Sequence, residues 1–62
     1  MATEKQVRYI LHLLDKNGYS VRYMDKAFKE LGAKMNERSG LVEDWVASRN
    51  TAEASNLIKQ LL

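Results

Sequence analysis

Hydrophobic residues recur every three or four positions along most of this 62-residue chain, which is the spacing of amphipathic helices. Thr3 and Gln6 are placed to form a capping box at the start of a helix over residues 4–16. Asn17-Gly18 ends this helix, since glycine adopts the left-handed conformation easily, and Tyr19 is then expected to fold back on it. The predicted buried stripe is Val7, Ile10, Leu11 and Leu14.

A second stripe begins after Ser20, a residue type that caps helix N-termini well. Gly32 ends this second helix in the same way that Gly18 ends the first. Residues 33–40 show no clean period and are expected to form a connector, from which Met35 enters the core. The second stripe consists of Val21, Met24, Ala27, Phe28 and Leu31.

The last third of the chain predicts two more helices. The first is short, begins at Ser39 or Gly40, and turns Leu41, Val42, Trp45 and Val46 inward. Asn50 and Glu53 are spaced as a second capping box, which predicts the start of the final helix. Its inward residues are Ala54, Leu57, Ile58 and Leu61.

No segment alternates with period two, and the chain has no proline and only three glycines, so strands have little support. We therefore predict an all-α fold, a compact bundle of four short helices forming one domain over residues 1–62. Helices of this length are unstable alone and must pack on one another. With no long apolar run and no signal peptide, we expect a cytoplasmic protein that does not enter membranes.

Few residues could carry chemistry. Without cysteine, and with His12 as the only histidine, a metal site is not expected. Ser39 has no histidine and carboxylate partners, and the three glycines are too far apart for a phosphate-binding loop. Glu43 and Asp44 suit the first turn of a helix better than a catalytic pair. We therefore predict no enzymatic activity, no cofactor and no small-molecule substrate.

Basic residues gather in the middle of the chain, although the net charge of the whole is only +2. Residues 16–38 hold six basic and three acidic side chains, and a basic face of this kind is typical of phosphate binding. We therefore predict contact with DNA or RNA through the second helix and the connector. The alternative is an ordinary solvated face neutralised by Asp25–Lys29 and Lys26–Glu30 pairs. The predicted contact residues are Arg22, Lys26 and Lys29 at helical spacing, followed by Lys34 and Arg38.

The start of the third helix offers a second way to bind an anion. Ser39 is predicted to cap the helix and Gly40 to permit a tight entry, which leaves Arg38 free beside the backbone amides. Capping alone is the favoured interpretation, because a serine cap satisfies the free backbone amides whether or not an anion binds.

Aromatic residues allow a protein-interaction hypothesis. Tyr9 and Leu13 flank the main stripe of the first helix at i and i+4, and Tyr23 sits similarly beside Met24. They form either a broad core-facing surface or a patch for a homodimer or a host protein. Trp45 is predicted to be the centre of the core, with an exposed binding anchor as the alternative.

Several short motifs carry a family resemblance. They are Thr3-Glu4-Lys5-Gln6, Glu37-Arg38-Ser39-Gly40, Val42-Glu43-Asp44-Trp45 and Glu53-Ala54-Ser55 with Leu57-Ile58. In these, nearly the whole chain resembles a family of small bacterial proteins encoded on phages, plasmids and integrated elements. The first and last motifs are also similar to helical modules appended to phage recombination and DNA-processing proteins. The resemblance implies a mobile-element context and a role in DNA or RNA transactions or in interference with host proteins. It assigns no functional residue.

Overall fold

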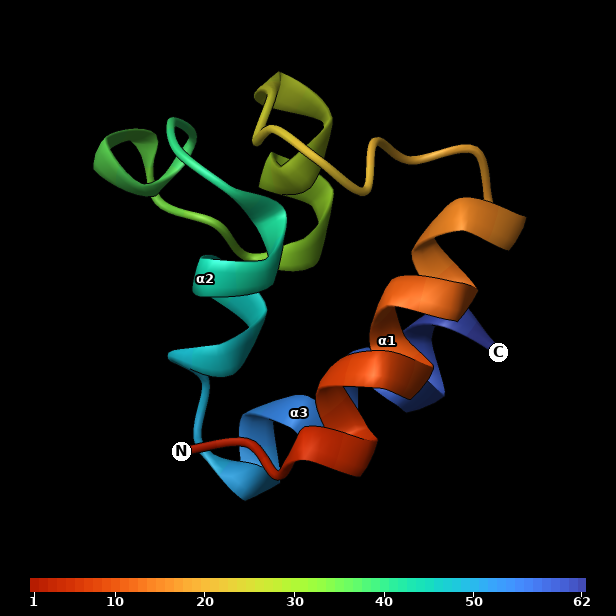
Figure 1. Cartoon of the computed structure of the whole chain (residues 1–62). Coiled ribbons are helices and arrows are strands. Elements are labelled where there is room, and N and C mark those ends of the chain that lie inside the picture. Colours follow the sequence, from red (N-terminus) through yellow and green to blue (C-terminus); the bar gives the residue numbers. More distant parts are fainter.

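A computed structural model describes all 62 residues and contains five helical elements and no strand (Figure 1). The α-helices are α1 (Glu4–Lys16), α2 (Val42–Ala47) and α3 (Thr51–Leu61). Two 3₁₀ segments, η1 (Lys26–Leu31) and η2 (Met35–Glu37), lie between α1 and α2. The all-α prediction is confirmed, with α1, η1, α2 and α3 in the places of the four predicted helices.

Local sequence determines the ends of α1 and the start of α3. Thr3 with Gln6, and Asn50 with Glu53, form the two predicted capping boxes, each with both reciprocal hydrogen bonds. After α1, Gly18 has φ +84° and the Tyr19 N–H donates to the Leu14 carbonyl at 2.9 Å. This backward bond is the Schellman arrangement that the Asn17-Gly18 sequence predicts.

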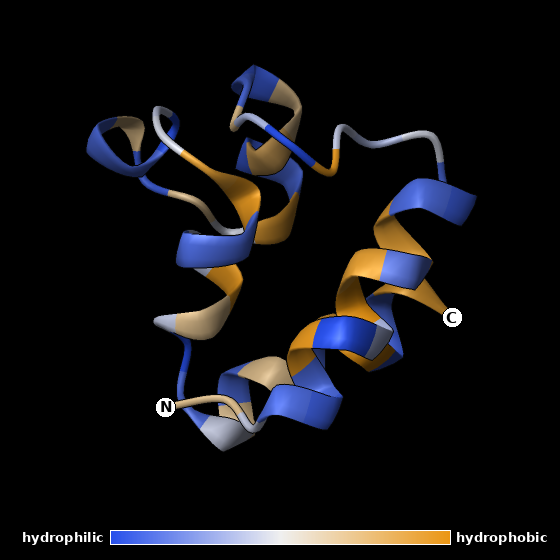
Figure 2. Ribbon diagram, in the orientation of Figure 1, coloured by the Kyte–Doolittle hydropathy of each residue, from blue (hydrophilic) through white to orange (hydrophobic).

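One hydrophobic core joins α1, η1, α2 and α3. Helix α1 packs on α3 and on α2, and Figure 2 shows its apolar side turned toward them. Phe28 of η1 is fully buried and meets the Trp45 ring edge-to-face at 5.8 Å between centroids. Trp45 is only 6% exposed, which confirms its predicted place in the core. The other buried residues are Val7, Ile10, Leu13, Leu14, Met24, Leu31, Ala33, Val42, Val46, Ala54, Leu57 and Leu61.

The predicted stripe of α1 is wrong at one edge. Leu13 is 5% exposed and belongs to the core, whereas Leu11 is only partly buried and packs at its margin. Both leucines flank the line through Ile10 and Leu14, on opposite sides. Leu13 lies beside Leu61 of α3, and the Asn17 side chain donates to the Leu61 carbonyl at 3.1 Å, so α3 covers this side of α1 and encloses Leu13.

The second predicted helix is shorter than its apolar spacing indicates. Residues 21–25 are not helical, and Val21 is 43% exposed. Asp25 has an extended backbone and its side chain accepts from the Ala27 N–H at 2.9 Å, so η1 begins only after it. Met35, predicted to enter the core, is instead 82% exposed.

Residues 22–24 and 40–42 pair as two short antiparallel segments. The Met24 N–H donates to the Gly40 carbonyl at 2.9 Å, and the Val42 N–H to the Arg22 carbonyl at 3.0 Å. These bonds enclose the Tyr23–Leu41 bridge, the name we use for this pairing. The pairing also corrects the start of α2: Leu41, rather than Ser39 or Gly40, is the capping residue, and no side chain caps it.

Candidate nucleic-acid interface

Lys26 and Lys29 lie on one edge of η1. A 3₁₀ helix has three residues per turn, so side chains at i and i+3 are aligned. The same geometry aligns Phe28 with Leu31 on the buried edge. The two lysines are exposed and are separated by about 6 Å along the helix axis, from a rise of about 2 Å per residue.

The carboxylates expected to neutralise these lysines are bonded elsewhere. Asp25 caps η1 through the Ala27 N–H, and Glu30 accepts a hydrogen bond from the Tyr19 hydroxyl at 3.2 Å. Desolvation and this bond to Glu30 raise the pKa of Tyr19. The salt bridges of the chain involve only Arg8 with Glu4, and Arg49 with Glu37 and Glu53. Neither predicted i,i+4 pair on η1 therefore forms.

Arg22 lies outside the helix that was expected to carry it. Its guanidinium Cζ is 5.5 Å from the ring centroid of Tyr23, at a cation–π distance. Its carbonyl accepts the Val42 N–H, so the Arg22 backbone is fixed by the Tyr23–Leu41 bridge. Arg22 and Lys26 do not share one helical face, and the basic surface is built from two segments of different geometry.

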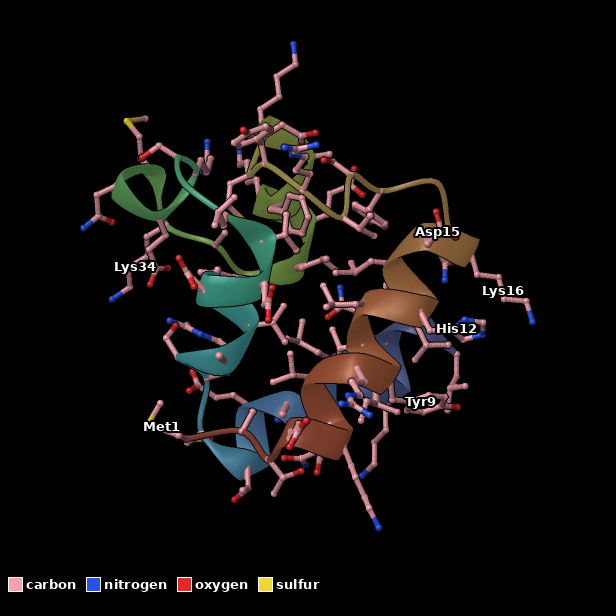
Figure 3. All side chains as sticks on the ribbon, viewed as in Figure 1. Met1, Tyr9, His12, Asp15, Lys16 and Lys34 are labelled. Atoms are coloured by element: carbon pink, nitrogen blue, oxygen red, sulfur yellow. The ribbon has the colours of Figure 1, made fainter.

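Lys34 and Arg38 behave differently from each other. The Lys34 side chain is exposed and projects from the molecule on the side opposite Lys16 in the view of Figure 3. Arg38 is half-buried, and its Nε donates to the Ala33 carbonyl at 3.4 Å. The predicted anion site beside Ser39 is not formed, because Arg38 folds back and the first amide of α2 is taken by Arg22.

The predicted partner patch does not exist as a single surface. Tyr9 and Tyr23 are 43% and 58% exposed, but Leu13 is enclosed in the core. Figure 3 shows Tyr9 on α1 next to His12, whereas Tyr23 belongs to the Tyr23–Leu41 bridge. The i,i+4 spacing shows that Tyr9 and Leu13 are neighbours on one helix. It does not show which of the two residues α3 covers.

A partly buried polar cluster holds the connector that carries Lys34. An Arg49 terminal nitrogen donates to a Glu37 carboxylate oxygen at 3.0 Å, with the two side chains 19% and 24% exposed. The Lys34 N–H also donates to Glu37, at 2.9 Å. This backbone bond first, and then the Arg49 charge, lower the pKa of Glu37. The cluster ties the connector to the loop before α3.

No enclosed cleft is associated with the basic residues. One surface pocket of about 170 Å³ has Trp45, Arg49 and Gln60 in its wall, and another of about 280 Å³ is lined by Leu13, Asn17 and Leu61, among others. None of the five predicted contact residues lines either pocket. The predicted contact residues therefore lie outside both pockets.

Comparisons with known proteins give no match: no family model, curated protein or solved structure is significantly similar to this chain. No helix of the structure combines the length and the hydrophobicity that crossing a bilayer requires.

Proposed function

We propose that this protein is a small helical nucleic-acid-binding module. Its phosphate contacts are Arg22, Lys26, Lys29 and Lys34, which lie on one continuous segment of the chain. Arg38 acts indirectly, because it holds the connector through Ala33. The proposed action is binding without catalysis, in the cytoplasm, and the mobile-element context implied by the family resemblance is part of the same hypothesis.

The observation that carries this proposal is that the two lysines of η1 form no salt bridge within the protein. Asp25 and Glu30 are the nearest acids in sequence, and both are engaged by other groups of the protein. Lys26 and Lys29 thus have no carboxylate within salt-bridge distance, although acids lie one residue from each. Unpaired, aligned ammonium groups are available to replace the counterions of a phosphate backbone.

The test is binding of the whole protein to fluorescent oligonucleotides at several salt concentrations, read by anisotropy. With four phosphate contacts the log–log slope of affinity against salt is expected near −3.6 for duplex DNA and −2.8 for single strands, from about 0.9 or 0.7 per contact. The dissociation constant at physiological salt should lie at about 10⁻⁴ to 10⁻⁶ M.

A matched pair of variants separates a specific surface from diffuse attraction. Lys26→Glu/Lys29→Glu and Lys5→Glu/Lys59→Glu change the net charge equally, and all four lysines are exposed. The first variant should nearly abolish binding, and the second should retain most of it. Equal losses would mean only general charge attraction, and an absence of binding by the unaltered protein at low salt would refute the proposal.

A further inference from the structure

Tyr23 is exposed although nothing in the fold requires an aromatic ring there. The side chain is 58% exposed and its hydroxyl makes no hydrogen bond within the protein. The neighbouring Tyr19 shows the contrast, since it packs on Phe28 at 5.6 Å between ring centroids and bonds Glu30. The Tyr23 ring therefore lies on the surface, and it neither packs on a core aromatic ring nor forms a hydroxyl hydrogen bond as Tyr19 does.

The position of Tyr23 is nevertheless rigidly defined. Two backbone hydrogen bonds flank it, and its own N–H donates to the Ser20 hydroxyl at 3.3 Å. Met24, the next residue, is 7% exposed and anchors the segment in the core. Because side chains alternate along an extended segment, burial of Met24 directs Tyr23 outward.

Leu41 and Arg22 are the neighbours of the Tyr23 ring, and we call these three side chains the platform. Leu41 is opposite Tyr23 in the bridge, in a pair flanked rather than joined by hydrogen bonds, so the two side chains lie close together. Leu41 is itself 42% exposed. The Arg22 guanidinium lies over the Tyr23 ring. Aromatic rings and guanidinium planes are both groups on which nucleobases stack.

We propose that the nucleic acid bound by this protein is single-stranded and that one unpaired base stacks on the platform of Tyr23, Leu41 and Arg22. This inference rests on the proposed function and adds the class of ligand. Lys26 and Lys29 follow Tyr23 by three and six residues and would hold the adjoining phosphates. A base within a duplex is already stacked on both faces and cannot use the platform, whereas every unpaired base offers a free face.

The experiment uses the whole protein and three probes: a 15-nucleotide oligothymidylate, an abasic strand of the same length, and a duplex of the same length. Oligothymidylate should bind more tightly than either other probe. Tyr23→Ala should weaken oligothymidylate binding by roughly 5- to 150-fold, the range that loss of one base–aromatic stack produces. The same variant should leave abasic-strand and duplex binding unchanged.

Two variants control for folding and for general surface effects. Tyr23→Phe keeps the ring and should bind oligothymidylate as the unaltered protein does. Tyr9→Ala removes a similarly exposed tyrosine from α1 and should have no effect. Circular dichroism and thermal melting of each variant verify the fold. If Tyr23→Ala is unstable, the comparison of oligothymidylate with the abasic strand on the unaltered protein still tests stacking, because only the first probe carries bases.

The two proposals fail in different ways. Equal affinity for the abasic strand and oligothymidylate, with losses in Lys26→Glu/Lys29→Glu, would overturn stacking and leave phosphate binding in place. Binding to none of the probes would remove the proposed function itself, and stacking with it. A self-association in sedimentation that Tyr23→Ala abolishes would also overturn the inference, because it would assign the platform to a second copy of the chain.

Discussion

The guanidinium of Arg49 lies over the indole ring of Trp45, with its Cζ 5.1 Å from the ring centroid. Phe28 meets the same indole with its edge, so Trp45 links the core to the polar cluster of Arg49 and Glu37. The Trp45 Nε1 is buried without a hydrogen bond of standard geometry, and its contact with the Glu37 carboxylate helps to lower the pKa of that group. The indole is thus held by packing and by the cation above it.

The first prediction concerns Trp45. Replacement by alanine should lower the free energy of unfolding by about 3–5 kcal/mol, the usual loss for a buried tryptophan. For a domain of this size such a loss approaches the whole stability. Urea unfolding followed by circular dichroism measures it. Trp45→Phe keeps much of the packing and should cost clearly less; a Trp45→Ala midpoint equal to that of the unaltered protein would contradict the core assignment.

The second prediction uses the two flanking leucines of α1. Leu13→Ala should be destabilising by about 2–5 kcal/mol, because Leu13 is enclosed between α1 and α3. Leu11→Ala deletes the same atoms from a partly exposed position and serves as the matched control, with a smaller loss. Thermal or urea unfolding measures both losses of stability. If Leu11 rather than Leu13 faced the core, as the sequence pattern indicates, Leu11→Ala would be the more destabilising substitution.

The third prediction concerns the turn after α1. Gly18 has φ +84°, and an added Cβ would meet no atom within 4 Å, so a substitution there tests backbone strain alone. Gly18→Ala should destabilise the protein by about 1–2 kcal/mol, the cost of a left-handed conformation for a residue with a side chain. Gly18→Asn should cost less, since asparagine tolerates this conformation. Equal melting temperatures for glycine and alanine would exclude the left-handed turn.

The fourth prediction is a pH dependence that originates at Glu37. Its pKa is lowered in the folded protein, chiefly by the Lys34 N–H and also by Arg49. The folded state therefore favours the ionised carboxylate, and the stabilisation is complete above the ordinary pKa of a glutamate. It is lost as the pH falls through that value and then through the lowered one.

The measurement for Glu37 is urea unfolding at pH 7 and at about pH 3. The unaltered protein should lose more stability on acidification than Glu37→Gln, because the glutamine has no proton to take up. A Glu37→Gln profile parallel to that of the unaltered protein would contradict this origin.

The sequence determined those parts of the protein whose structure depends on neighbours within five or six residues. The capping boxes at Thr3 and Asn50 and the turn at Gly18 use only hydrogen bonds of this range, so α1 and α3 could be located from sequence. Most of the buried faces of α2 and α3 also followed from spacing, since Val42, Trp45, Val46 and Leu57 are in the core, but Leu41, predicted to turn inward, is 42% exposed and Ile58 is only partly buried.

Only the tertiary structure decided the pairing of residues 22–24 with residues 40–42 and, with it, the candidate interface, whereas the end of η1 at Gly32, where φ is +91°, followed from the sequence. Arg22 and Lys26 would share a face only within one α-helix, but backbone bonds to residues 40–42 hold Arg22 in a non-helical segment. Those partners are some 18 positions away, beyond the reach of any local pattern. The same pairing placed Tyr23 beside Leu41, while the 3₁₀ geometry of η1 aligned Lys26 with Lys29. The spacing of apolar residues indicates which residues can be buried together. Several conformations and packings of the segments satisfy that spacing, and long-range backbone hydrogen bonds, together with the helix that covers each face, decide among them.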